Sequence, residues 1–191
     1  MSKLRIASSD LWLETVLDDF DSFVLDHASC ERKASATALS LISHYPDRRE
    51  LVEQMMLLAR EELEHFHQML WIIHSRDLIL APDAKDLYVQ ELRKEFRHGG
   101  SDAYFLDRLL VGGIVEARGC ERFGRVADAL EAGPLKDFYQ DIARTESQHH
   151  VLFFNLARKY FDPAAVEARQ DELLDREAEI IQALPVRPIV H

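Results

Sequence analysis

The chain has 191 residues, enough for one domain with a single hydrophobic core and too few for two comfortable ones. Only seven glycines and six prolines accompany abundant Leu, Ala, Glu and Arg, a composition that favours a helical class. The formal net charge of −11 excludes a general attraction for nucleic acid, so a polyanionic partner would have to use a local basic patch.

Neither a targeting sequence nor a membrane span is visible. Residues 1–25 lack a basic start followed by an apolar run, and no apolar stretch approaches the roughly 20 residues that cross a bilayer. We therefore expect a cytoplasmic protein with no membrane partner. In a reducing cytoplasm Cys30 and Cys120 are expected to stay free thiols, with a disulfide as the alternative.

Apolar periodicity, caps and breakers predict helices throughout and no strand. The predicted helices cover, approximately, residues 10–44, 47–76, 82–97, 101–131, 134–161 and 162–183. Ser8-Ser9-Asp10 supplies a cap for the first helix, and Ser101 or Asp102 supplies one for the 101–131 helix. Gly99-Gly100 is expected to close the 82–97 helix.

These helices predict a four-helix bundle with two additions. The turns before residues 47 and 134 are short, so the helices that flank each turn should form antiparallel hairpins. The long 77–100 connection then crosses from one hairpin to the other, as in ferritin-like bundles. We predict an all-α, ferritin-like fold in one domain, residues 1–191, with a crossover helix between the second and third long helices and an extra C-terminal helix.

The pattern Glu-x-x-His marks candidate metal ligands, because residues three apart project from nearly the same side of a helix. The four copies are Glu62/His65, Glu64/His67, Glu95/His98 and Glu146/His149. The first and last copies lie in apolar stripes, beside residues such as Met69 and Phe153. The middle two have polar or glycine neighbours, so we interpret them as solvated.

A lone glutamate in an apolar stripe precedes each of the two selected pairs. Glu31 precedes Glu62 by 31 residues, and Glu116 precedes Glu146 by 30. Glu121, the alternative in the same helix as Glu116, shares its side with charged residues and is rejected. The matched spacings indicate an internal duplication, and carboxylate-bridged two-metal bundles use this ligand pattern.

The six predicted ligands could neutralise two divalent metals. They are Glu31, Glu62, His65, Glu116, Glu146 and His149. Four carboxylates offset two divalent cations while both imidazoles stay neutral, so the filled centre could be buried. Oxygen and imidazole donors without thiolate suit Fe or Mn better than structural Zn, and open positions remain for O2. The alternative is a set of separate buried or paired glutamates, which are rarely buried without partners.

Several neighbours of the predicted ligands have two interpretations each. Small residues around Glu116 could leave room beside it, or the glycines among them could permit close helix packing, which is the favoured interpretation; they are Gly112, Gly113, Gly119 and Cys120. Glu61 could hydrogen-bond a ligand histidine or be an ordinary solvated helix residue. His27 could line the side of Glu31 or be a satisfied core histidine.

The ligand pattern, which spans residues 31–149, resembles the ferritin-like di-iron carboxylate superfamily. Within it, the chain is similar to the bacterial tRNA 2-methylthio-N6-isopentenyladenosine hydroxylase (MiaE-type) family. The similarity lies in length and in the runs Ala-Arg-Glu-Glu-Leu-Glu-His-Phe at 59–66 and Arg-Thr-Glu-Ser-Gln-His-His at 144–150.

This resemblance implies a non-haem di-iron monooxygenase whose six ligands hold two Fe ions. Such an enzyme takes O2, and two electrons from a separate reductase or ferredoxin system. It hydroxylates the isopentenyl group of the modified adenosine beside the tRNA anticodon. That base lies in a single-stranded loop, where it can unstack into a pocket.

The sequence offers two sets of basic residues for tRNA phosphates. They are Arg118, Arg122 and Arg125 on one helix side, and Arg93 and Arg97 with Lys94 on the crossover helix. The alternative is that both sets are ordinary solvated helix faces with acidic partners. Two other functions stay open: a ferroxidase in a large iron-storage shell, and a di-iron oxidase of a small molecule or of a chain held by an acidic carrier protein.

Overall fold

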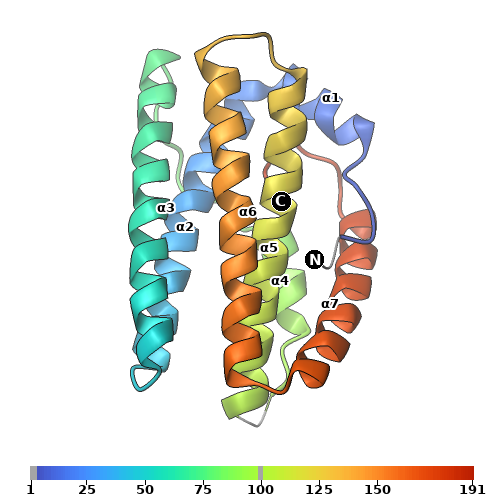
Figure 1. The fold of residues 1–191 in the computed structure, drawn as a ribbon. Helices are drawn as coiled ribbons and strands as arrows, with labels where there is room; N and C mark the ends of the chain where they lie inside the picture. Colours follow the sequence, from blue (N-terminus) through green and yellow to red (C-terminus); the bar gives the residue numbers. More distant parts are fainter. Residues whose placement is uncertain (1–3, 99–100) are drawn as a thin grey trace. The chain divides into compact units, whose positions relative to one another are not determined.

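The computed structural model describes residues 4–98 and 101–191, and these residues form seven α-helices and no strand. In chain order the helices are α1 (Asp10–Asp18), α2 (Phe20–His44), α3 (Arg49–Ser75), α4 (Leu87–Lys94), α5 (Ser101–Ala129), α6 (Pro134–Tyr160) and α7 (Pro163–Ala183) (Figure 1). The all-helical prediction is confirmed. No described helix is both long enough and apolar enough to cross a membrane.

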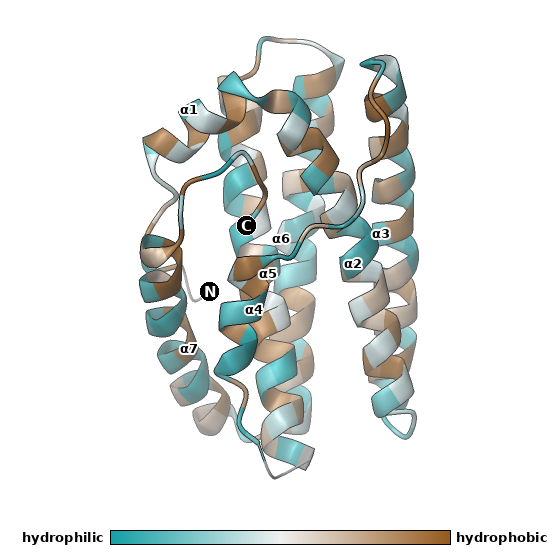
Figure 2. Cartoon of the chain, turned by 180° about the vertical axis from the view of Figure 1, so that it is seen from behind, coloured by the Kyte–Doolittle hydropathy of each residue, from teal (hydrophilic) through white to brown (hydrophobic). Residues whose placement is uncertain are grey.

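The chain divides into two compact units. The first-hairpin unit comprises residues 14–84 and 187–190, and the second-hairpin unit comprises residues 1–13, 85–186 and 191. The single domain over residues 1–191 stays a prediction. Both hydrophobic and hydrophilic residues occur along each long helix, as amphipathic packing requires (Figure 2).

In the first-hairpin unit α2 and α3 pack side by side (Figure 1). The hydroxyl of Ser35 on α2 donates a hydrogen bond to the carbonyl of Ala59 on α3, at 2.8 Å. Phe23, Leu41 and Met55 are among the side chains that are almost fully buried. Burial of such apolar groups contributes roughly 25 cal/mol per Å² and holds the hairpin together.

The predicted helix over residues 10–44 is two helices, because the chain breaks at Asp19. Asp19 has φ −132° and ψ 64°, and its carboxylate accepts a hydrogen bond from the backbone N–H of Ser22 at 3.2 Å. It therefore caps α2 from inside a periodic apolar run. Ser9 caps α1 as predicted, accepting from the backbone N–H of Trp12 at 3.1 Å.

The crossover helix is shorter than predicted. Its cap is Asp86, which accepts from the backbone N–H of Val89 at 2.9 Å, so α4 starts at Leu87 rather than near residue 82. The next helix, α5, already includes Ser101 and Asp102, so neither residue is its cap. The predicted Gly99-Gly100 closure lies outside the described residues.

In the second-hairpin unit, α5 and α6 approach closely at two glycines. A Cβ at Gly112 would lie 2.9 Å from Cε1 of Phe153, and one at Gly113 would lie 3.1 Å from Cε2 of Phe154. The close-packing interpretation of Gly112 is confirmed. These glycines admit aromatic rings of α6 rather than leave an open space.

The second-hairpin unit also contains a buried polar network between α5 and α7. Arg118 donates to both carboxylate oxygens of Glu177, from Nε at 2.9 Å and from Nη2 at 3.1 Å. The hydroxyl of Tyr88 donates to Oε1 of Glu177 at 3.0 Å. A second buried carboxylate, Asp107, accepts from Nε of Arg169 at 2.9 Å. These pairs fix α7 against α5.

Candidate metal centre

Glu31 of α2 and Glu62 and His65 of α3 form a cluster inside the first-hairpin unit, here called the α2–α3 half-site. Each offers one ligand atom, and these atoms lie within 4.8 Å of one another. Nδ1 of His65 is 3.5 Å from Oε2 of Glu31 and 3.6 Å from Oε2 of Glu62. The three residues are 3%, 1% and 8% exposed.

Helical spacing and apolar packing produce this cluster. Glu62 and His65 share the side of α3 that also carries Met55, Leu58 and Met69, each 0–2% exposed. Burying that apolar stripe turns the carboxylate and imidazole inward as well. The sequence therefore places charged donors inside the hairpin.

The electrostatics of the α2–α3 half-site shift the pKa values of Glu31 and His65 in opposite directions. Burial by itself would raise the pKa of Glu31, but attraction and hydrogen bonding by His27, with a hydrogen bond from His65, hold it well below its ordinary value. Burial would lower the pKa of His65, but the nearby carboxylates of Glu31 and Glu62 raise it to about 10. A metal ligates only the neutral imidazole, so metal binding at His65 should become more favourable as the pH rises.

Glu116 of α5 and Glu146 and His149 of α6 form a second cluster inside the second-hairpin unit, here called the α5–α6 half-site. Their ligand atoms also lie within 4.8 Å of one another. Nδ1 of His149 is 3.7 Å from Oε2 of Glu146. Glu146 and His149 are each 3% exposed, whereas Glu116 is only half-buried.

The donor chemistry of both half-sites fits a divalent cation. Each brings two carboxylates and one imidazole together, and two adjacent carboxylates with so little access to water repel each other unless a cation lies near. Oxygen and nitrogen donors without thiolate are typical of Fe and Mn. Cys30 and Cys120 are free thiols, as predicted.

Comparison with known protein families identifies the family to which the chain belongs. A family model described as tRNA-(MS2IO6A)-hydroxylase (MiaE) matches residues 1–191. The chain belongs to the MiaE family. Because the family consists of hydroxylases, this MiaE chain is an enzyme of the oxygenase class.

Two named relatives support the assignment to the MiaE family. The tRNA 2-(methylsulfanyl)-N(6)-isopentenyladenosine(37) hydroxylase of Pseudomonas putida is 36% identical over 180 residues, which cover 94% of this chain and 87% of that protein. The enzyme of the same name from Salmonella typhimurium is 30% identical over 136 residues, covering 71% of this chain and 49% of that protein.

A solved structure confirms the fold class. It is described as protein 43 with aldehyde deformylating oxygenase activity from Synechococcus, and it matches with a TM-score of 0.94 at 30% sequence identity. The match covers 100% of this chain and 96% of that chain. The MiaE chain thus has the all-α, ferritin-like fold that the helix pattern predicts.

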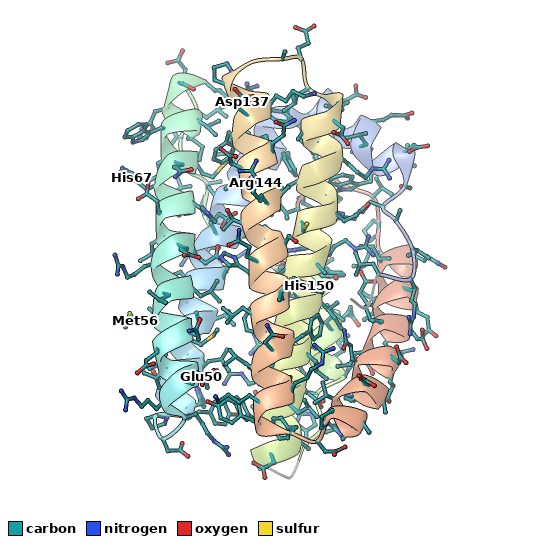
Figure 3. The ribbon with its side chains drawn as sticks, in the orientation of Figure 1. Glu50, Met56, His67, Asp137, Arg144 and His150 are labelled. Atoms are coloured by element: carbon teal, nitrogen blue, oxygen red, sulfur yellow. The ribbon has the colours of Figure 1, made fainter. Side chains whose placement is uncertain are left out.

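The rejected Glu-x-x-His copies lie outside both half-sites. The side chains of Glu64 and His67 are 62% and 57% exposed, and His67 projects from the outer side of α3 (Figure 3). Glu95 forms an ion pair with Arg176 at 3.0 Å, and His98 is exposed. Glu64 and His67 are solvated, as predicted, whereas the side chain of Glu95 is only 24% exposed.

The structure contradicts the interpretation of Arg118 and Arg122 as part of a solvated basic face. They are 0% and 5% exposed. Arg118 is engaged by Glu177, while Nε of Arg122 donates to Oγ of Ser8 at 2.9 Å and its guanidinium lies 4.5 Å from the ring centroid of Trp12. Their charges act inside the second-hairpin unit, so they are poorly placed to meet a polyanion.

The remaining predicted basic residues differ in their availability. Nη2 of Arg125 donates to Asp10 at 2.6 Å, and its side chain is 24% exposed. Arg97 is 43% exposed and donates from Nη2 to Oδ1 of Asp107 at 2.8 Å. Arg93 lies exposed on α4. The accessible cations of the two predicted sets therefore lie on α4 and just after its end.

His27 is a site residue whose role the sequence left open. It is fully buried, and its Nε2 lies 2.5 Å from Oε1 of Glu31. The signal was its position one helical turn before Glu31. By contrast, Glu61 is exposed on α3, as its simpler interpretation predicts.

Proposed function

We propose that this MiaE chain is a non-haem di-iron monooxygenase that hydroxylates the isopentenyl group of 2-methylthio-N6-isopentenyladenosine in tRNA. One oxygen atom of O2 enters a C–H bond of the substrate, and the other leaves as water after reduction by two electrons and two protons. The observation that carries the proposal is the presence of two alike carboxylate–imidazole half-sites in a chain of a hydroxylase family.

The six residues of the half-sites are proposed to hold one di-iron centre. They are Glu31, Glu62, His65, Glu116, Glu146 and His149. Their four carboxylates neutralise two divalent ions, which supports placing both metals in an apolar interior. When bound, the two Fe ions would supply the activation of O2.

Buried apolar side chains beside both half-sites are proposed to keep water away from the centre. Met55 and Met69 beside the α2–α3 half-site are buried, as are Ile142 and Phe153 beside the α5–α6 half-site. Such walls would exclude water from the centre and so limit side reactions. Nδ1 of His150 lies 2.8 Å from the carbonyl of Gly113 and so helps to fix α6 against α5.

The proposed partners are the anticodon loop of tRNA and an electron-donating reductase or ferredoxin, in the cytoplasm. The names of the two curated relatives support tRNA as substrate. Arg93 and the exposed edge of Arg97 are proposed to contact phosphates, since Arg118 and Arg122 are buried. The target base would unstack from the single-stranded loop to reach the centre.

Nucleoside analysis of tRNA tests the proposal in cells. Deleting the protein should remove the hydroxylated nucleoside and leave its unhydroxylated precursor. Complementation with the wild-type chain should restore it, whereas Glu62→Ala should not. Unchanged nucleosides after deletion would overturn the proposal. Turnover of an aldehyde, the class of activity named for the structure from Synechococcus, would then become the leading alternative.

A further inference from the structure

The two lone glutamates of the half-sites have different neighbours one helical turn earlier. Glu31 follows His27 by four residues on α2, and Nε2 of His27 lies 2.5 Å from Oε1 of Glu31. Neither side chain has appreciable access to water, with exposures of 0% and 4%. A hydrogen bond this short between buried groups strongly restricts the carboxylate.

The two oxygens of Glu31 have distinct partners. Oε1 accepts from Nε2–H of His27, whereas Oε2 faces Nδ1 of His65 at 3.5 Å. Because a carboxylate only accepts, Nε2 of His27 must carry the proton. Oε2 is thereby directed toward Glu62 and His65, the other donors of the α2–α3 half-site.

At the position of α5 that corresponds to His27, the sequence has glycine rather than histidine. The residue four positions before Glu116 is Gly112, which has no side chain. A Cβ at Gly112 would already lie 2.9 Å from Cε1 of Phe153, so a histidine there would have to displace the ring. Glu116 is also half-buried, in contrast to Glu31 with its 3% exposure.

We infer that His27 is a positioning residue for Glu31, and that the α2–α3 half-site consequently binds its metal more tightly than the α5–α6 half-site. This inference rests on the proposed di-metal function. A ligand carboxylate that is already oriented loses less freedom when a metal binds, and removal of such a supporting hydrogen bond typically costs 10- to 100-fold in metal affinity. The two metal positions are therefore inequivalent despite identical ligand types.

Titration of the metal-free protein with Co2+ tests the inference. The wild-type chain should bind two ions in two resolved steps, followed by absorption spectroscopy and elemental analysis. His27→Leu should weaken the tighter step by about 10- to 100-fold and leave the weaker step in place. His27→Gln, which keeps a side-chain donor, should recover most of the lost affinity. His67→Leu is the matched control, because this histidine of the same unit is exposed.

Two further variants assign the steps to the half-sites. Glu31→Gln should impair the tighter step, and Glu116→Gln the weaker one. Thermal unfolding of each metal-free variant checks its fold, and His27→Met replaces His27→Leu if the latter does not fold. A His27→Leu curve identical to that of wild type, or loss of the tighter step in Glu116→Gln, would overturn the inference. Failure of the wild-type chain to bind Co2+ at all would instead overturn the proposed function.

Discussion

Arg118 of α5 and Glu177 of α7 form an ion pair at 2.8 Å in which both side chains are 0% exposed. The geometry is bidentate, and Glu177 also accepts from Tyr88. Such pairs contribute little net stability relative to apolar replacements, but loss of one partner leaves a buried charge without compensation. The pair therefore acts chiefly to specify how α7 packs on α5.

Glu177→Ala should lower the free energy of unfolding by about 3–5 kcal/mol, because it leaves the Arg118 guanidinium buried beside an empty space. The double variant Arg118→Met/Glu177→Leu should be less destabilised than the single variant. Urea unfolding measures both. Glu179→Ala, whose side chain is 64% exposed, is the control and should change stability by less than about 0.5 kcal/mol. Equal losses in the Glu177 and Glu179 variants would contradict this role.

Metal content should distinguish Glu116 from Glu121. Glu116→Ala removes a donor of the α5–α6 half-site and should lose at least one of two Fe ions per chain. Glu121 accepts hydrogen bonds from the backbone and hydroxyl of Ser8, outside both half-sites, so Glu121→Ala should retain both ions. Elemental analysis of protein from iron-replete cells makes the comparison. Equal iron content in the two variants would remove Glu116 from the ligand set.

Chelation should lower the melting temperature of the wild-type protein, because a metal that binds only the folded state stabilises it by mass action. Glu62→Ala, with an incomplete α2–α3 half-site, should respond less to the chelator. Differential scanning calorimetry before and after metal removal provides the measurement. A melting temperature that does not respond to metal removal would show that the carboxylates are stable without an ion.

Acid should weaken the second-hairpin unit through Asp107. Burial would raise the pKa of this carboxyl, but hydrogen bonds from Arg97 and Arg169 lower it below its ordinary value of 3.8. A depressed folded-state pKa gives stability that is present above pH 3.8 and is lost as the pH falls through the folded-state pKa. Asp107→Asn should therefore flatten the acid side of the stability curve. Asp141→Asn, at an exposed position, should leave that curve unchanged.

Binding of tRNA should depend on Arg93 more than on other exposed cations. Each neutralised phosphate contributes a slope of about −0.7 to −0.9 in log K against log salt. Arg93→Ala should flatten the slope by about one such increment. Arg144→Ala is the control, since this exposed side chain on α6 already pairs with Asp141 (Figure 3). Equal slopes for both variants would place RNA recognition elsewhere.

Local sequence patterns predicted most of the fold. Pro134 and Pro163 mark the starts of α6 and α7, where proline fits the first helical turn. The break at Asp19 was missed because a capping aspartate inside an apolar-periodic run does not disturb the periodicity. The start of α4 was also mispredicted. Asp86 caps this helix by accepting a hydrogen bond from the backbone N–H of Val89, so the helix begins later than Pro82 suggests.

The predicted ligands cluster within each unit because the same apolar stripes that form the hairpins carry them inward. The prediction that Arg118 and Arg122 could contact tRNA phosphates was wrong, because it assumed that a charged side of a helix faces solvent. Helical spacing places these arginines on one side of α5, but it does not show that α7 covers Arg118. Glu177, the ion-pair partner of Arg118, is 59 residues away in the sequence, and no local pattern connects the two residues.

Oxygen transfer by the purified protein tests the central claim most directly. Iron-loaded protein would be mixed with tRNA that carries the unhydroxylated nucleoside, a chemical reductant and isotopically labelled O2, and the nucleosides would be analysed by mass spectrometry. The account predicts one labelled oxygen atom in the isopentenyl group, with no product from Glu62→Ala. Oxygen derived from water, or no product from protein that holds two Fe ions, would contradict it.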